Sequence, residues 1–92
     1  MQEVELHAVF RGEVQGVGFR YSAQHWAERH GVRGSVRNLP DGAVKLIAQG
    51  DKPVLEAFIE ALKETRGRCF VDHVDVHYST PQQPLEGFRI VH

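Results

Sequence analysis

The spacing of apolar residues changes several times along this chain, and the succession of spacings limits the folds that it can adopt. From Val4 to Phe10 every second residue is apolar, which is the period of a half-buried strand. From Phe19 onward the apolar residues recur at helical spacing, and Gly31 follows as a left-handed cap. The first third of the chain therefore predicts a strand, a glycine-rich loop over 12–18 and a helix.

The same two periods predict the remaining elements. Strands are expected at 32–38, 43–49, 74–78 and 88–91, and a second helix is expected to begin after its candidate N-cap Asp51, to carry Pro53 in its first turn and to end at Gly67. The segment 39–42 combines a proline with Asp-Gly, a turn-forming sequence, so the two strands beside it should form a hairpin.

The predicted order is β-α-β-β-α-β with a short extra C-terminal strand. This order is typical of an α+β ferredoxin-like sandwich, an antiparallel sheet with two helices on one face, and residues 1–92 are expected to form a single domain. Domains of this kind include enzymes, regulators and RNA-binding modules, so function has to be argued from the site.

Composition excludes several classes of partner. Eleven basic and 12 acidic residues give a net charge of -1, which leaves no broad cationic surface for a nucleic acid or an anionic membrane. Cys69 is the single cysteine, so the chain has no internal disulfide and no CxxC pair, and we expect a buried structural thiol in a reducing compartment. The residues after Met1 resemble neither a secretory signal nor a membrane span, which favours a cytoplasmic protein.

The most informative segment is 12–20, which reads GEVQGVGFR. Its glycines allow successive backbone amides to point into one concavity, and the start of the following helix adds free amides and partial positive charge. Arg20 contributes a permanent charge on a planar fork that suits a phosphate. The spacing matches no nucleotide-binding fingerprint, so a single phosphoryl group is the expected ligand. A tight turn with a solvated Arg20 explains the residues equally well at this point.

This segment resembles the first signature of the acylphosphatase family, with every fixed position filled. A second signature of the family is matched through the hairpin by Gly34, Val36, Arg37, Asn38, Gly42, Val44 and Gly50. The resemblance extends over essentially the whole chain. Ser35 departs from it, because the family usually carries an aromatic residue there. In a strand Ser35 faces away from Asn38, so we expect altered packing and intact catalysis.

The resemblance implies a hydrolase that cleaves the carboxyl-phosphate bond of small-molecule acyl phosphates, without a metal or other cofactor. It assigns Arg20 to the phosphoryl group, together with the backbone amides of Gln15, Gly16, Val17, Gly18 and Phe19. It assigns Asn38 to the attacking water, although by itself Asn38 reads as a turn residue ahead of Pro40. Inorganic phosphate is then product and competitive ligand, and a monomer is expected. The acyl group is not specified.

Other chemistries fit less well. His73 and His77 could share a strand face, but exposed polarity explains them better, and the spacing of His25 and His30 does not suit two metal ligands on one helical face. A ferredoxin-like RNA-binding module would need aromatic residues on its sheet. A further alternative is a phosphate site that serves a larger protein, because domains resembling acylphosphatases also occur within proteins that process carbamoyl phosphate.

Overall fold

The predicted order of elements is confirmed in the structure, a computed structural model that describes residues 3–16, 18–64 and 70–91. Along the chain the elements are β1 (Glu3–Glu13), α1 (Phe19–His30), β2 (Arg33–Asn38), β3 (Val44–Asp51), α2 (Lys52–Lys63), β4 (Phe70–Ser79) and β5 (Phe88–Val91). α1 ends at the predicted cap, Gly31, which adopts a left-handed conformation.

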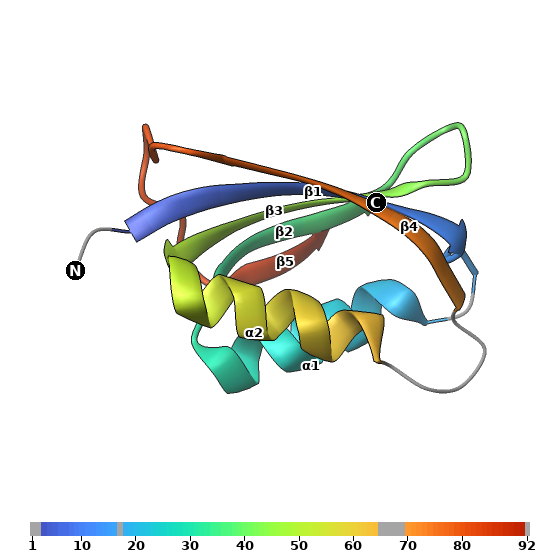
Figure 1. The fold of residues 1–92 in the computed structure, drawn as a ribbon, viewed down its shortest axis with the longest axis horizontal. Coiled ribbons are helices and arrows are strands. Elements are labelled where there is room, and N and C mark those ends of the chain that lie inside the picture. Colours follow the sequence, from blue (N-terminus) through green and yellow to red (C-terminus); the bar gives the residue numbers. More distant parts are fainter. Residues whose placement is uncertain (1–2, 17, 65–69, 92) are drawn as a thin grey trace.

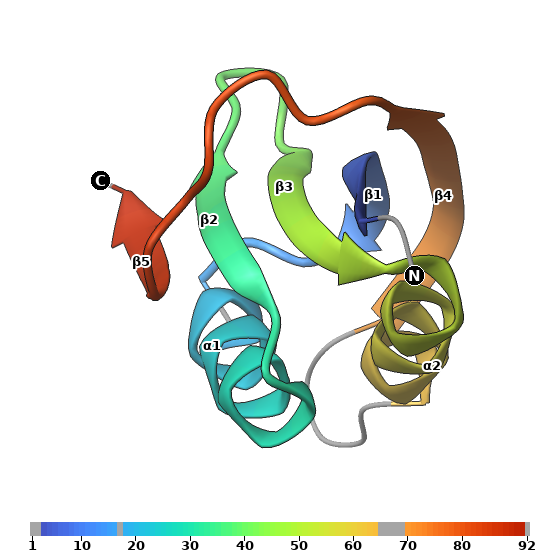
Figure 2. The ribbon, with the colours of Figure 1, turned by 90° about the vertical axis from the view of Figure 1, so that its left-hand side faces the viewer.

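The strands form one sheet in the order β4-β1-β3-β2-β5. The strands of the β-α-β-β-α-β frame are antiparallel neighbours, and the short C-terminal strand β5 joins in parallel to β2, so the whole sheet is mixed. Both helices cover the same face (Figures 1 and 2). Because β1, β2 and β5 run in one direction, their carboxyl ends lie at the same edge of the sheet.

The core lies between this sheet face and the helices. Phe10 pairs with Val44 across the β1–β3 ladder, and both are fully buried. The helices bury their own apolar stripes against this face, with Phe19, Ala23 and Ala27 from α1 and Leu55, Phe58, Ile59 and Leu62 from α2. The rings of Phe10 and Phe19 are 5.0 Å apart between centroids, so the first residue of α1 is seated below the end of β1.

Several predicted boundaries differ from those of the structure, among them β4, which was expected over 74–78 and spans Phe70–Ser79. β1 continues to Glu13 because β4 begins at Phe70 and pairs with Gly12 and Glu13 across a bulge, which shortens the predicted loop to residues 14–18. α2 ends at Lys63, one residue after Leu62, the last residue of its apolar stripe. The predicted end at Gly67 lies outside the described residues.

The start of α2 agrees with its prediction in position but not in detail. Asp51 occupies the N-cap position and Pro53 lies in the first turn. The Asp51 side chain makes no capping hydrogen bond, and its backbone is extended because Asp51 is also the last residue of β3, paired with Glu3.

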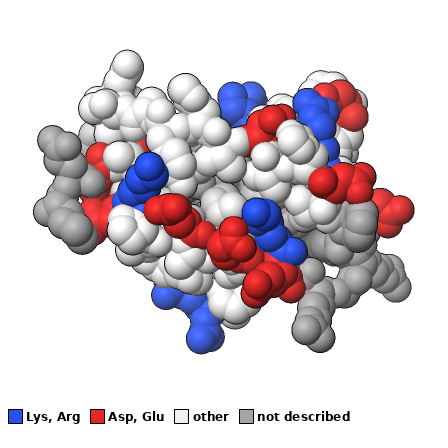
Figure 3. Space-filling view, in the orientation of Figure 1, with Lys and Arg blue, Asp and Glu red and all other residues white. Residues whose placement is uncertain are grey.

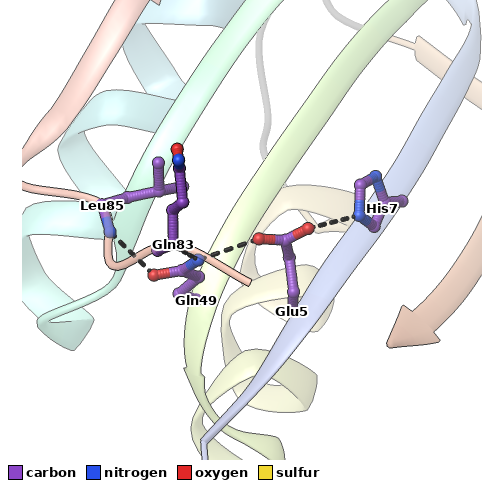
Figure 4. A network of polar contacts seen from close by, with 5 residues as sticks. All are labelled: Glu5, His7, Gln49, Gln83 and Leu85. Carbon is purple, nitrogen blue, oxygen red and sulfur yellow. Dashed lines mark hydrogen bonds and ion pairs between the residues drawn. The ribbon is translucent and has the colours of Figure 1, made fainter. Parts of the chain in front are cut away.

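The opposite face of the sheet is crossed by residues 80–87, which connect β4 to β5 (Figure 2). This segment is attached to the sheet through the buried side chain of Gln49 (Figure 4). Gln49 Nε2 donates to Glu5 Oε1 at 2.8 Å and to the Gln83 carbonyl at 2.7 Å, and its Oε1 accepts from the Leu85 amide at 2.9 Å. The buried amide is therefore satisfied on both ends, which makes its burial tolerable.

Gly34 lies where β2 and β3 leave no room for a side chain, so its replacement should destabilise the fold strongly. A Cβ at this position would lie 1.9 Å from the Ile47 carbonyl oxygen of β3. We expect Gly34→Ala to lower the free energy of unfolding by about 3 kcal/mol, at the upper end of single substitutions. Urea denaturation followed by tryptophan fluorescence measures the change.

Gly50→Ala is the matched control for this prediction, because a Cβ there would meet Leu55 Cδ2 at an ordinary 3.7 Å. Its free energy of unfolding should change by less than about 1 kcal/mol. Equal losses in the two variants would contradict the steric explanation for Gly34.

Candidate active site

The loop between β1 and α1 brings backbone amides together at the start of a helix. Gly16 and Gly18 have φ angles of 74° and 83°, and Gly18 is the N-cap of α1. A Cβ at either glycine would meet nothing within 4 Å, so these positions need glycine for its backbone conformation and not for space. The first amides of α1 have no carbonyl partner within the helix and carry its partial positive charge. Val17 lies outside the described residues.

A pocket of about 250 Å³ opens at this helix start, lined by Val14, Gly16, Gly18, Phe19, Arg20 and Tyr21. Arg20 is half-buried, and its Nη1 donates to the Val91 carbonyl of β5 at 3.4 Å. The first turn of α1 reads Phe-Arg-Tyr-Ser, so it contributes no carboxylate that would oppose an anion. Tyr21, which is 64% exposed, lines the same pocket. Backbone amides, a guanidinium and an aromatic side chain thus surround one small cavity.

Asn38 lies at the same edge of the sheet. It is the last residue of β2 and pairs with Val44, which in turn pairs with Phe10 of β1. Residues paired directly across a sheet share one face, so the exposed Asn38 side chain lies on the helix side, where α1 begins. Figure 1 shows the β2–β3 turn and the start of α1 at one end of the molecule. The structure therefore brings Arg20, Asn38 and the described loop residues to one edge.

Gln15 plays a part that the sequence did not reveal. Its side chain turns toward the β2–β3 turn, where Nε2 donates to the Leu39 carbonyl at 2.7 Å and to the Ala43 carbonyl at 2.8 Å. A donor with two protons next to a turn could have suggested such a contact, but no local pattern identifies acceptors so distant in sequence.

Positive potential at this site is local. Lys, Arg, Asp and Glu side chains are interspersed on the face shown in Figure 3, in agreement with a net charge of -1. Near the β2–β3 turn, Arg11 Nη1 lies 3.0 Å from Asp41 Oδ2. The hydrogen bond from the Ala43 amide, and then that from Arg11, lower the pKa of Asp41 from its ordinary value.

Three histidines of the described strands lie away from this pocket. His73 Nε2 is 2.9 Å from Asp75 Oδ1, and the rings of His7 and His77 are 6.5 Å apart, all on the sheet face opposite the helices. Within the ranges 3–16, 18–64 and 70–91, no three His, Cys, Asp or Glu side chains are grouped to hold a metal ion. Cys69, the thiol predicted to be buried, lies outside the described residues.

Two larger hollows lie on that opposite face, with volumes of about 340 and 290 Å³, and Ser35 and Leu85 line both. Neither contains a helix start. A third hollow of about 400 Å³, lined by Lys63, Val71, Asp72, His73 and Val74, lies at the other end of a helix and includes a carboxylate. The smaller pocket at Arg20 is therefore the better candidate for an anion. Segment 80–87 crosses this face, which is where a ferredoxin-like RNA-binding module would stack bases. Ser35 faces away from Asn38, as predicted from strand alternation.

Comparison with known proteins agrees with this site. The sequence profile of the Acylphosphatase family matches residues 6–90. The chain belongs to the acylphosphatase family. An acylphosphatase from Thermococcus kodakarensis is 42% identical over 91 residues, which cover 99% of both chains. The sequence resemblance described above is confirmed by these relatives.

Solved acylphosphatase structures share the fold. The crystal structure of acylphosphatase from Bacillus subtilis superposes with a TM-score of 0.92 at 34% identity, covering 97% of this chain and 99% of that one. Full-length HypF in its phosphate- and nucleotide-bound form matches with a TM-score of 0.87 at 26% identity, but this chain covers only 12% of it. No helix within the described parts of this acylphosphatase-family chain is long and apolar enough to cross a membrane.

Filling the space beside Ser35 should stabilise the protein without changing catalysis. The side chain borders both hollows and lies on the face away from the Arg20 pocket. We expect Ser35→Phe to raise the free energy of unfolding by about 1 kcal/mol, as cavity-filling changes commonly do, with kcat within two-fold of wild type. Urea denaturation measures the gain, and Ser35→Ala, which fills nothing, is the control. A ten-fold loss of kcat in Ser35→Phe would contradict this prediction, since it would show that a change on the sheet face opposite the helices alters catalysis.

The lowered pKa of Asp41 predicts how the stability of the turn depends on pH. A carboxylate whose folded pKa is below its unfolded value, roughly 3.9, stabilises the fold above that value. The contribution is lost as the pH falls through the lowered folded pKa. We expect wild type to have a higher Tm than Asp41→Asn at pH 7, with a difference that shrinks as the pH falls through the lowered pKa of Asp41. A difference that stays constant with pH would contradict the assignment.

Proposed function

We propose that this protein hydrolyses the carboxyl-phosphate bond of acyl phosphates to a carboxylate and inorganic phosphate. The observation that carries the proposal is the pocket formed by Arg20 and the start of α1, which lies at the same edge of the sheet as Asn38. The pocket suits one phosphoryl group, and an acyl phosphate carries a leaving group good enough to need little protonation. Membership of the acylphosphatase family supports the same reaction.

In this reaction the phosphoryl group lies in the 15–20 loop. The amides of Gln15 to Phe19 and the Arg20 guanidinium donate to its equatorial oxygens, which carry the charge during transfer. Arg20 Nη1 also donates to the Val91 carbonyl, at the end of β5. Since the guanidinium and the helix start supply positive charge at the phosphoryl group, we propose that the reaction proceeds without a metal ion or other cofactor.

Asn38 orients the attacking water in line with the departing carboxylate. The water oxygen bonds to phosphorus as the bond between phosphorus and the acyl oxygen breaks, and a phosphate oxygen of the substrate takes the water proton. An amide side chain is not a base, so its contribution is positioning. The exposed position of Asn38 at the end of β2 leaves room for water beside it.

Substitution at the two residues tests these roles with benzoyl phosphate as substrate, in the presence of EDTA. Arg20→Ala should lower kcat/KM by about 10³-fold and weaken inhibition by inorganic phosphate, because it removes charge from the phosphoryl site. Asn38→Ala should lower kcat by about 10²-fold and leave the inhibition constant of phosphate within two-fold. Arg20→Lys, which keeps the charge without the planar fork, should fall between wild type and Arg20→Ala.

Three results would contradict the proposal. A wild type that does not turn over benzoyl phosphate would exclude the enzyme activity. Activity abolished by EDTA would exclude a metal-independent reaction. Equal loss of phosphate inhibition in Arg20→Ala and Asn38→Ala would exclude the division of roles.

Carbamoyl phosphate is a second substrate to examine, because it is itself an acyl phosphate and domains resembling acylphosphatases also occur within proteins that process it. Assays of benzoyl, acetyl and carbamoyl phosphate at equal concentrations compare the acyl groups directly. Turnover of carbamoyl phosphate alone would favour a role beside a larger carbamoyl-processing system over a general acylphosphatase.

A further inference from the structure

The side chain of Gln15 joins the two halves of the candidate site. Its backbone belongs to the loop that leads to Arg20, while its Nε2 donates to two carbonyls of the β2–β3 turn. A primary amide has two N–H protons, so this contact uses both of them. The side chain is half-buried, which limits competition from water for these bonds.

The two acceptors are the carbonyls that also close the turn. The Leu39 amide donates to the Ala43 carbonyl at 2.8 Å, and the Gly42 amide donates to the Leu39 carbonyl at 3.2 Å. The Gln15 side chain therefore adds one hydrogen bond to each of these two carbonyls. One of them belongs to Leu39, the residue that follows Asn38. The ladder between β2 and β3 ends with the pair of Asn38 and Val44.

Asn38 is consequently held from two sides. Strand pairing fixes its backbone relative to β3, and Gln15 fixes the next residue relative to the phosphate loop. The first constraint sets which face the Asn38 side chain occupies, and the second sets how far the end of β2 lies from the loop. Positioning of this kind is valuable because a displacement of about 1 Å can cost 10²-fold in rate.

We propose that the Gln15 side chain is a positioning residue for hydrolysis, which sets the distance between Asn38 and the bound phosphoryl group through the Leu39 and Ala43 carbonyls. The inference rests on the proposed function and adds a role distinct from that of the Gln15 backbone amide. It separates two requirements: Arg20 and the loop amides bind the phosphate, and Gln15 aligns the water held by Asn38.

Gln15→Met tests this role, because methionine has a similar length but no N–H donor. We expect kcat for benzoyl phosphate to fall about ten-fold, while the inhibition constant of inorganic phosphate stays within two-fold of wild type. Gln24→Met is the matched control, since it removes another glutamine-to-carbonyl bond, from Gln24 Nε2 to Phe88 at 3.3 Å, and should leave kcat within two-fold.

A double-mutant cycle distinguishes positioning through Asn38 from a general loss of stability. In the Asn38→Ala background, adding Gln15→Met should lower kcat no further, because the group that it positions is already absent. Losses that multiply would overturn the proposal. If Gln15→Met does not fold, Gln15→Asn makes the same test, because its side chain is one methylene shorter and withdraws the amide from the Leu39 and Ala43 carbonyls.

The outcomes also separate this inference from the proposed function. If wild type hydrolyses benzoyl phosphate and Asn38→Ala lowers kcat as expected, unchanged kcat in Gln15→Met overturns only the positioning role. If Gln15→Met weakens inhibition by inorganic phosphate as much as it lowers kcat, the Gln15 side chain would be assigned to phosphate binding instead. Inactive wild type would overturn both proposals.

Discussion

The contact between Phe10 and Phe19 is the interaction on which the site depends most. It places the first residue of α1 beneath β1, close to the end of that strand, with ring centroids 5.0 Å apart. The chain must therefore reverse direction between Glu13 and Phe19, within a few residues. Such a short reversal requires glycines with positive φ, and these same glycines let backbone amides face one point. Burial of two aromatic rings thus creates the conditions for an anion site.

Parallel strand direction supplies the rest of the site. β1, β2 and β5 run the same way, so Glu13, Asn38 and Val91 end at one edge of the sheet. Three parts of the chain meet this edge. The start of α1 contributes free amides, the end of β2 contributes the Asn38 side chain, and the end of β5 contributes the Val91 carbonyl, which accepts from Arg20. Local geometry, more than net charge, makes an anion site possible in a chain of net charge -1.

The two faces of the sheet carry different groups of residues. The helix side carries the core and the candidate site, whereas the opposite side carries histidines, the Gln49 network and the hollows beside Ser35. Strand alternation keeps these sets apart, because neighbouring residues point in opposite directions. This separation explains how the chain can depart from its family at Ser35 while it retains Arg20 and Asn38.

Much of the fold was determined by the sequence alone, because helix and strand periods and glycine caps are local signals. The limits of β5 and the end of α1 at Gly31 were predicted from them, and family signatures indicated Arg20 and Asn38. The extension of β1 to Glu13, the parallel pairing of β5 and the role of the Gln15 side chain were decided by tertiary structure. Each depends on partners far along the chain, such as the Leu39 and Ala43 carbonyls 24 and 28 residues from Gln15. Periodicity cannot specify such partners. It indicates which face of a helix or strand a residue occupies, but not which distant backbone group lies within hydrogen-bond distance of its side chain.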